Sequence, residues 1–338
     1  MDADRKKSDF SAISIGPHLA YTKFMESIGA DTTQMRHHMT HQQSFVLKGA
    51  NFLRSVRAIP AGYKYYVSES CFYYPVMARR FGRISGKIID LCASPTYYYL
   101  LTNRIRGVGK RILTNLLRDV DGFLFEGKFV GDVVHKLGVD KPNGIVYTYV
   151  KPERFATLAR RKPSLKSKNV SIIATNDAYY KGLDILLEAM EIVNVEDPEI
   201  TLTVIPKNID FVPLRHLMTE NVKIDTDMMR ALCYTSLYVH PARGDVFPAS
   251  PLEAMLGGIP TIVSDNMGTR EVVEAVNRDF VVSPDPKSVA EQILAYFSLN
   301  YAQKSKLSLK FRNAAKHYNE KEQVANFKTV LKRLLTEV

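Results

Sequence analysis

The feature that most constrains the fold is an alternation of short apolar runs with longer amphipathic stretches along most of the chain. The short runs are rich in β-branched and aromatic residues, which favours buried strands, and the stretches between them have helical periodicity. Strands joined by helices pair in parallel, so this order predicts an α/β fold. In the first half we expect strands at 10–16, 63–70, 87–94, 122–127 and 144–150, and helices at 18–28, 72–81, 106–118 and 129–137.

A polar, basic segment interrupts this alternation once. Residues 151–169 contain two prolines and several cations, which is typical of a linker. A second series follows, with strands expected at 170–175, 200–206, 222–225, 237–242 and 261–265, and helices at 182–193, 227–235, 251–257, 268–276, 287–298 and about 303–336. A chain of 338 residues is long for one core, so we expect two α/β domains with a ligand cleft between them.

Composition narrows the class of protein and its surroundings. Apolar content of 46% and charged content of 24% are ordinary for a globular protein, and three scattered cysteines suggest neither a disulfide framework nor a zinc site. The start of the chain is polar, and no run of about 18 apolar residues is present. We expect a cytoplasmic enzyme or binding protein, either free or peripheral at the inner face of the membrane.

The positive charge is concentrated in the first half. Residues 1–155 carry 23 Lys and Arg against 13 Asp and Glu, whereas residues 156–338 carry 23 against 22. The first half is therefore expected to meet an anionic surface or ligand.

One loop of the second series places two acids beside a helix start. Asp245 and Glu253 are eight positions apart in "ARGDVFPASPLEAMLGGIP" (242–260), between an expected strand and an expected helix. The alternative interpretation is an exposed loop acid followed by an acid at a helix N-terminus, where negative charge is favourable. Upstream, Lys181 precedes a glycine in "YYKGLDILLEAM" (179–190) and is either a ligand contact or an exposed turn residue.

These two motifs resemble the retaining nucleotide-sugar glycosyltransferases of family four, also called glycosyltransferase group 1. The likeness extends to the segments "GIVYTYVKPERF" (144–155), "SIGPHLAYTKFMESIGA" (14–30) and "HYNEKEQVANF" (317–327), and is strongest over 144–338. It implies the GT-B fold, with two facing Rossmann-like domains and a cleft between them. It also implies transfer with retention of configuration, and no metal or other cofactor.

The resemblance assigns roles by position. Lys181, Asp245 and Glu253 correspond to the catalytic and donor-binding positions, where lysine meets the donor diphosphate and the acids accept hydroxyl hydrogen bonds. Gly16 lets the backbone approach the phosphates closely. The full predicted donor-binding set is Gly16, Asn176, Lys181, Arg243, Val246, Phe247, Pro248, Ala249, Ser250 and Glu253.

The chain departs from the family pattern at two places. Asn176 stands where the family has an arginine that helps to neutralise the departing nucleotide. Either another cation, Lys207 or Arg243, takes its place, or transfer is slow or lost. Asp245 replaces the first glutamate, and Val246 and Pro248 replace the glycines that flank Phe247. The sugar of the donor is therefore left open.

The histidines are interpreted as mostly structural. His240 lies on an apolar strand and is expected in the core, and His18 is either structural or a phosphate contact. The cluster "HHMTH" (37–41) lacks acidic or cysteine partners, which favours a polar loop over a metal site.

A basic and aromatic stretch in the first half suggests a membrane contact. The segment 97–118 joins "YYYLL" to an amphipathic stretch with Arg104, Arg106, Lys110 and Arg111. It is either a helix on the sheet with a solvated basic edge or a surface for anionic lipid.

The sequence thus predicts a glycosyltransferase that uses a nucleotide-sugar donor, with a lipid-linked acceptor or a polysaccharide precursor. We expect an acceptor-binding domain at 1–155, a donor-binding domain at 156–315 and a returning helix at 316–338. Two alternatives remain: a nucleotide-sugar epimerase of the same fold, and a non-catalytic nucleotide- or nucleic-acid-binding protein whose strands "YKYY" and "TYYYLL" stack bases. No nucleic-acid motif is present, so nucleic acid is not an expected partner.

Overall fold

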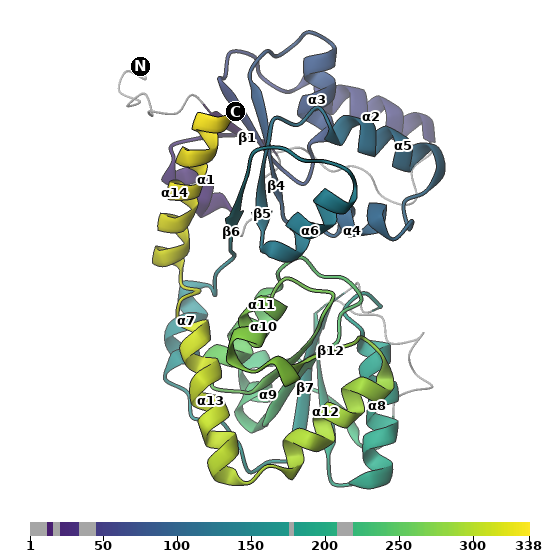
Figure 1. Ribbon diagram of the computed structural model, residues 1–338, viewed down its shortest axis with the longest axis vertical. Helices are drawn as coiled ribbons and strands as arrows, with labels where there is room; N and C mark the ends of the chain where they lie inside the picture. Colours follow the sequence, from purple (N-terminus) through teal and green to yellow (C-terminus); the bar gives the residue numbers. More distant parts are fainter. Residues whose placement is uncertain (1–11, 16–20, 34–44, 176–178, 208–218) are drawn as a thin grey trace. The chain divides into compact units, whose positions relative to one another are not determined.

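The computed structural model describes residues 12–15, 21–33, 45–175, 179–207 and 219–338 (Figure 1). The chain divides into two compact units, which we call unit 1 (Met1–Thr148 with Val324–Val338) and unit 2 (Tyr149–Gln323). In the described residues each unit contains one six-stranded sheet in which every pairing is parallel. The predicted α/β class is confirmed.

Unit 1 has the strand order β2-β1-β3-β4-β5-β6. Its strands are β1 (Ala12–Ile15), β2 (Asp31–Thr33), β3 (Tyr65–Glu69), β4 (Lys87–Cys92), β5 (Gly122–Glu126) and β6 (Asn143–Val146). Its helices are α1 (Thr22–Ser27), α2 (Phe45–Arg57), α3 (Tyr73–Arg80), α4 (Thr96–Leu101), α5 (Gly107–Leu117), α6 (Lys128–Lys136) and most of α14 (Glu320–Glu337). The sequence did not predict β2, α2 or α4.

The direction of the crossovers places the helices of unit 1 on two sides of its sheet. From β2 to β6 the chain moves one way across the sheet, and right-handed crossovers then put α2, α3 and α5 on one side. The step from β1 to β2 runs the opposite way, so α1 lies on the other side with α14 (Figure 1). There Phe24 and Phe327 stack with ring centroids 4.8 Å apart.

The aromatic segment 96–101 corrects one sequence expectation. It forms helix α4, because Tyr97 and Leu100 lie three positions apart and are both buried. The Tyr97 hydroxyl donates to the fully buried Asp90 on β4. Burial raises the pKa of Asp90 to about 7, although hydrogen bonds from Ser68 and Tyr97 oppose this rise. The aromatic rings of this segment therefore do not form a base-stacking strand.

Unit 2 has the strand order β12-β11-β10-β7-β8-β9. Its strands are β7 (Asn169–Thr175), β8 (Thr201–Lys207), β9 (Val222–Ile224), β10 (Leu237–His240), β11 (Thr261–Ser264) and β12 (Val281–Val282). Its helices are α7 (Pro152–Ala159), α8 (Leu183–Glu196), α9 (Met228–Tyr234), α10 (Ala249–Leu256), α11 (Arg270–Val276), α12 (Pro286–Ser298) and α13 (Tyr301–Ala315).

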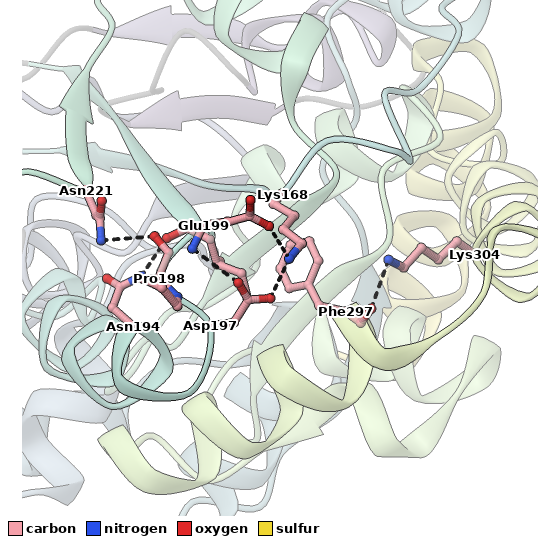
Figure 2. Close-up of polar contacts among 9 residues, drawn as sticks. Lys168, Asn194, Asp197, Pro198, Glu199, Asn221, Phe297 and Lys304 are labelled. Atoms are coloured by element: carbon pink, nitrogen blue, oxygen red, sulfur yellow. Dashed lines mark hydrogen bonds and ion pairs between the residues drawn. The ribbon is translucent and has the colours of Figure 1, made fainter.

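The amino edge of this sheet carries exposed polar contacts, shown in Figure 2. Lys168 precedes β7 and bonds to Asp197 at 2.7 Å and to Glu199 at 2.8 Å, both in the turn before β8 (Figure 2). The Asn221 side chain, before β9, donates to the Pro198 carbonyl (Figure 2). These contacts hold the turns that feed the three strands.

Two predicted boundaries were wrong in unit 2. The expected linker 151–169 contains α7, because Pro152 occupies the first helical turn, where its fixed φ favours a helix. The expected helix at about 303–336 is broken into α13 and α14. The Asn319 side chain accepts a hydrogen bond from the Glu322 amide at 2.9 Å, which caps the start of α14. The Val150 amide donates to the Tyr318 carbonyl at 2.9 Å in the break between the two helices.

Two further findings concern the described residues as a whole. No helix among them has the length and apolar character needed to cross a membrane. Cys71, Cys92 and Cys233 are free.

Candidate functional site

Three loops meet at the carboxyl edge of the unit 2 sheet, where parallel α/β sheets place their ligands. They follow β7, β10 and β11, which are neighbours in the sheet. The Arg243 amide donates to the Tyr180 carbonyl at 2.8 Å, which ties the second loop to the first. The Asp245 amide donates to the Asn266 carbonyl at 3.1 Å, which ties it to the third.

Two glycines allow this close packing of the loops. Gly182 has a φ of +71°, and a Cβ added there would lie 2.0 Å from the Pro241 carbonyl oxygen. A Cβ on Gly268 would lie 1.8 Å from the Val246 carbonyl oxygen. Any larger residue at either position would push the loops apart, and the residues of the site would separate.

Lys181 and Asp245 form an ion pair at the centre of these loops. The Lys181 ammonium bonds to Asp245 Oδ2, and the two side chains are only 20% and 18% exposed. Burial opposes ionisation of the carboxyl group, but the charge of Lys181 and the nearby His240 ring outweigh it and lower the pKa of Asp245 to about 2. The carboxylate is therefore ionised at neutral pH.

Two buried rings on β10 lie beneath this pair. His240 Nε2 is 3.5 Å from Asp245 Oδ2, and His240 Nδ1 is 3.2 Å from the Tyr238 hydroxyl. Both side chains are fully buried, as the core interpretation of His240 predicted. The sequence did not indicate that the ring would face Asp245.

Glu253 lies in α10 and is almost completely buried. Its Oε1 accepts a hydrogen bond from Arg154 Nη1 at 2.8 Å, and the side chains are 6% and 41% exposed. Arg154 comes from α7, in the segment that was expected to be a linker. Sequence reasoning missed this partner because nothing in the sequence relates residues 99 positions apart.

Arg243 is held by unit 2 itself. Its guanidinium makes a two-pronged contact with Asp184 at 2.7 and 2.8 Å, donates to the Tyr179 carbonyl at 2.6 Å, and lies 3.9 Å from the Tyr179 ring centroid. Bidentate pairs of this kind fix the geometry of arginine. Arg243 therefore braces the Lys181 loop against α8 in this structure.

The turn between the two acids is packed into unit 2. Val246, Phe247 and Pro248 are buried, and Ala249 and Ser250 are half-buried at the start of α10. The Phe247 ring packs against the Tyr318 ring, with centroids 5.8 Å apart. The helix begins two residues earlier than predicted, and its first amides have no acceptor within the helix.

The structure thus brings most of the predicted site together on one edge of unit 2. Lys181, Asp245, Arg243 and the turn 246–250 belong to adjoining loops, and Glu253 follows in the helix. Gly16 and Asn176 lie outside the described residues, as do His18, the histidines of 37–41 and the side chain of Lys207. Within the described part of the chain no cluster of three or more His, Cys, Asp or Glu side chains is arranged to hold a metal ion.

Comparison with solved structures shows the same fold over nearly the whole chain. The Anabaena protein HepE in complex with UDP and glucose covers 97% of this chain and 100% of its own, with a TM-score of 0.68 and 13% identity. A trehalose-6-phosphate protein from E. coli bound with UDP-2-fluoro glucose covers 97% of this chain and 99% of its own, with a TM-score of 0.69 and 11% identity. Sucrose-phosphate synthase from Thermosynechococcus elongatus covers 91% and 84%, with a TM-score of 0.67 and 13% identity.

The sequence itself matches one family model. No curated protein matches the chain significantly. Residues 156–318, which include Lys181, Asp245 and Glu253, match the model of "Glycosyl transferases group 1". The chain therefore has the GT-B fold, and its residues 156–318 match the group 1 glycosyl transferase model, in line with the resemblance seen in the sequence.

Proposed function

We propose that this protein is a retaining glycosyltransferase of the hexosyltransferase type, which moves a sugar from a nucleotide-sugar donor held by unit 2 to an acceptor held by unit 1. The observation that carries the proposal is the Lys181–Asp245 pair at the carboxyl edge of the unit 2 sheet. The half-buried ammonium of Lys181 suits the diphosphate of a nucleotide sugar, and the half-buried carboxylate of Asp245 suits the hydroxyls of its sugar. Burial of such a pair is otherwise costly for a folded protein.

Each group has a role that follows from its chemistry. The Lys181 ammonium leaves Asp245 for the donor diphosphate and stabilises the negative charge that grows as the sugar departs. Asp245 then accepts hydrogen bonds from sugar hydroxyls, and Glu253 accepts them from the ribose diol. The first amides of α10 face the donor at a helix end that favours anions. Cations and helix amides suffice to hold the diphosphate, so the proposal requires no metal.

The solved structures suggest which donors to test first. HepE is described with UDP and glucose, and the E. coli protein with UDP-2-fluoro glucose. The fold they share with this chain supports a UDP-linked sugar as a first candidate. Because Asp245 is one methylene shorter than glutamate, the panel also includes other sugars.

A thermal-shift panel of UDP-, GDP- and ADP-linked sugars tests donor binding. A donor at 100 times its Kd adds about 2.7 kcal/mol to the free energy of unfolding, so a matching donor raises the melting temperature clearly. Glu253→Ala should abolish most of the shift, whereas Glu199→Ala, at the amino edge, should leave it unchanged. If no nucleotide sugar stabilises the wild-type protein, the donor site is wrong. Product formed without any acceptor would instead identify an epimerase.

We also propose that the protein works as a peripheral enzyme at an anionic membrane, on a lipid-linked or phosphorylated acceptor. The charge excess of residues 1–155 supports this, as does the outer side of α5. Val108 and Ile112, one helical turn apart, are 73% and 52% exposed, and Arg111 and Arg118 are exposed beside them. Apolar and basic side chains that alternate on one helix face suit an anionic lipid surface. The aromatic residues of 97–101 contribute less than the sequence suggested, since Tyr97 is fully buried.

Liposome co-sedimentation tests this surface. Binding should rise with the fraction of anionic lipid and fall with salt, because salt screens the charges. Changing Arg104, Arg106, Lys110 and Arg111 to glutamate should remove it. The matched control changes four exposed lysines of unit 2 to glutamate, namely Lys287, Lys306, Lys310 and Lys316. Equal loss in both variants, or equal pelleting with neutral lipid, would rule out docking through α5.

A further inference from the structure

The carboxylate of Asp245 lies at the end of a line of buried polar groups that the proposed chemistry does not use. Tyr238 and His240 point to the same side of β10, because side chains two residues apart on a strand share a face. The Tyr238 hydroxyl accepts the Ile173 amide of β7 at 3.2 Å and lies 3.2 Å from His240 Nδ1. His240 Nε2 in turn lies 3.5 Å from Asp245 Oδ2.

The Tyr238 hydroxyl can accept and donate hydrogen bonds at the same time. A backbone N–H can only donate, so the Tyr238 oxygen is the acceptor of the Ile173 amide. The Ser250 hydroxyl also bonds to Tyr238, and a hydroxyl oxygen has room for two donors. The hydrogen of Tyr238 is then free for His240 Nδ1.

The tautomer of His240 follows in turn. Burial lowers the pKa of His240, so the ring is neutral and carries one N–H. Nε2 faces the carboxylate of Asp245, which can only accept, so the hydrogen of the ring sits on Nε2 and Nδ1 accepts the hydrogen of Tyr238. The line therefore delivers one N–H donor to the carboxylate.

The last link of this line, from His240 Nε2 to Asp245 Oδ2, is incomplete in the structure. Within the described residues His240 Nε2 makes no hydrogen bond of good geometry, and 3.5 Å is the outer limit for one. Oδ2 of Asp245 is bound by Lys181 instead. A fully buried N–H without a partner is unfavourable, so its retention beside the site calls for a second state in which it is satisfied.

We propose that Tyr238 and His240 are positioning residues that take over Asp245 Oδ2 when Lys181 turns to the donor diphosphate. The proposal rests on the donor site proposed above. In the bound state the His240 N–H then holds Oδ2, and Oδ1 accepts a hydroxyl of the donor sugar. Asp245 thus keeps its orientation at the moment when its cation leaves. Asp245 is shorter than glutamate, so the contact with His240 also sets the position of its carboxylate relative to the donor sugar.

Three variants test this line of polar groups through activity. Tyr238→Phe removes the hydroxyl but keeps the ring, and His240→Leu removes the donor, whereas His240→Gln keeps an amide N–H near the position of Nε2. We expect Tyr238→Phe and His240→Leu to lower kcat/KM for the donor by about ten- to hundredfold, as for a hydrogen bond to a charged group. His240→Gln should recover most of that loss. A purely structural role predicts equal losses for His240→Leu and His240→Gln, in step with their melting temperatures.

A spectroscopic measurement tests the hydrogen-bond direction from Tyr238 to His240 independently of enzyme activity. Nitrogen NMR of protein labelled at histidine, with His240 assigned from the spectrum of His240→Gln, should show the Nε2–H tautomer in the wild type. The Tyr238→Phe variant should lose that preference. An Nδ1–H tautomer in the wild type, or unchanged kcat/KM in Tyr238→Phe, overturns the proposal. If the wild type binds no nucleotide sugar, the proposed donor site is wrong, and so is the proposal that His240 holds Asp245 in the bound state. The spectrum still determines the tautomer of His240 in that case.

Discussion

The two edges of the unit 2 sheet use the same kinds of ion pair in opposite surroundings. At the amino edge, Lys168 is 42% exposed and its partners Asp197 and Glu199 are 28% and 77% exposed. At the carboxyl edge, Lys181 and Asp245 are each at most 20% exposed. Surface pairs contribute about 0–1 kcal/mol, whereas a buried charge is costly unless it is fully paired.

This difference in exposure shows that only the carboxyl-edge pair carries a desolvation cost. The amino-edge pairs hold turns together, and water can replace either partner. The Lys181–Asp245 pair lies in loops whose close packing two glycines permit, and each of its side chains is at most 20% exposed. Paired, buried charges at a loop cluster are what a site for a charged ligand requires. The comparison predicts that equal substitutions at the two edges have unequal effects.

Lys181→Ala should give the largest effect. Loss of a group that stabilises the charge growing in the transition state costs about a hundred- to a thousandfold in kcat. Steady-state kinetics with the donor identified by the thermal-shift panel measures this. Lys168→Ala, the same substitution at the amino edge, is the control and should leave kcat unchanged. A change in KM alone for Lys181→Ala would mean that the lysine contributes uniform binding.

Glu253→Ala should have the next largest effect. It removes a charge-assisted interaction with the donor, worth roughly 1.5–3 kcal/mol, or about ten- to hundredfold in affinity. Arg154→Ala should cost less, because Arg154 is half-exposed and leaves Glu253 in place. Titration calorimetry with the donor compares the two. Equal affinity in a folded Glu253→Ala variant would remove Glu253 from the site.

Much of this site could be predicted because its residues are local in sequence. Lys181 stands beside the glycine that the loop needs, and Asp245 and Glu253 stand eight positions apart around one turn. Strand runs such as 87–92 and 122–126 are buried along most of their length, so continuous apolar sequence indicated them directly.

The rest depends on contacts that sequence spacing does not carry. Arg154 reaches Glu253 only because α7 packs against α10 in unit 2. Helix α7 itself was missed because Pro152 signals both a turn and a helix start. The line from Tyr238 to Asp245 required the strand register and the direction of the loop, neither of which periodicity fixes.

Asp245→Asn tests the buried edge through stability and pH. The pKa of Asp245 falls from 3.8 to about 2 on folding, so its ionisation stabilises the folded state above pH 4 by about 2 kcal/mol. This contribution is lost as pH falls toward 2. Urea unfolding at pH 6 should therefore show the variant destabilised by about that amount, and at pH 3 the difference should shrink by roughly half. A difference that does not change with pH would mean that packing, and not charge, is lost.

The smallest expected effect is at the amino edge. Lys168→Ala breaks two bonds, to Asp197 and to Glu199, yet all three side chains are solvated, so each released charge returns to water. The free energy of unfolding should fall by clearly less than in Asp245→Asn, and added salt should reduce the loss further. Urea unfolding at low and high salt measures both quantities. A loss of stability as large as that of Asp245→Asn would mean that ion pairs at the two edges contribute equally to the free energy of unfolding. Burial of the pair would then not distinguish the candidate site from the amino edge.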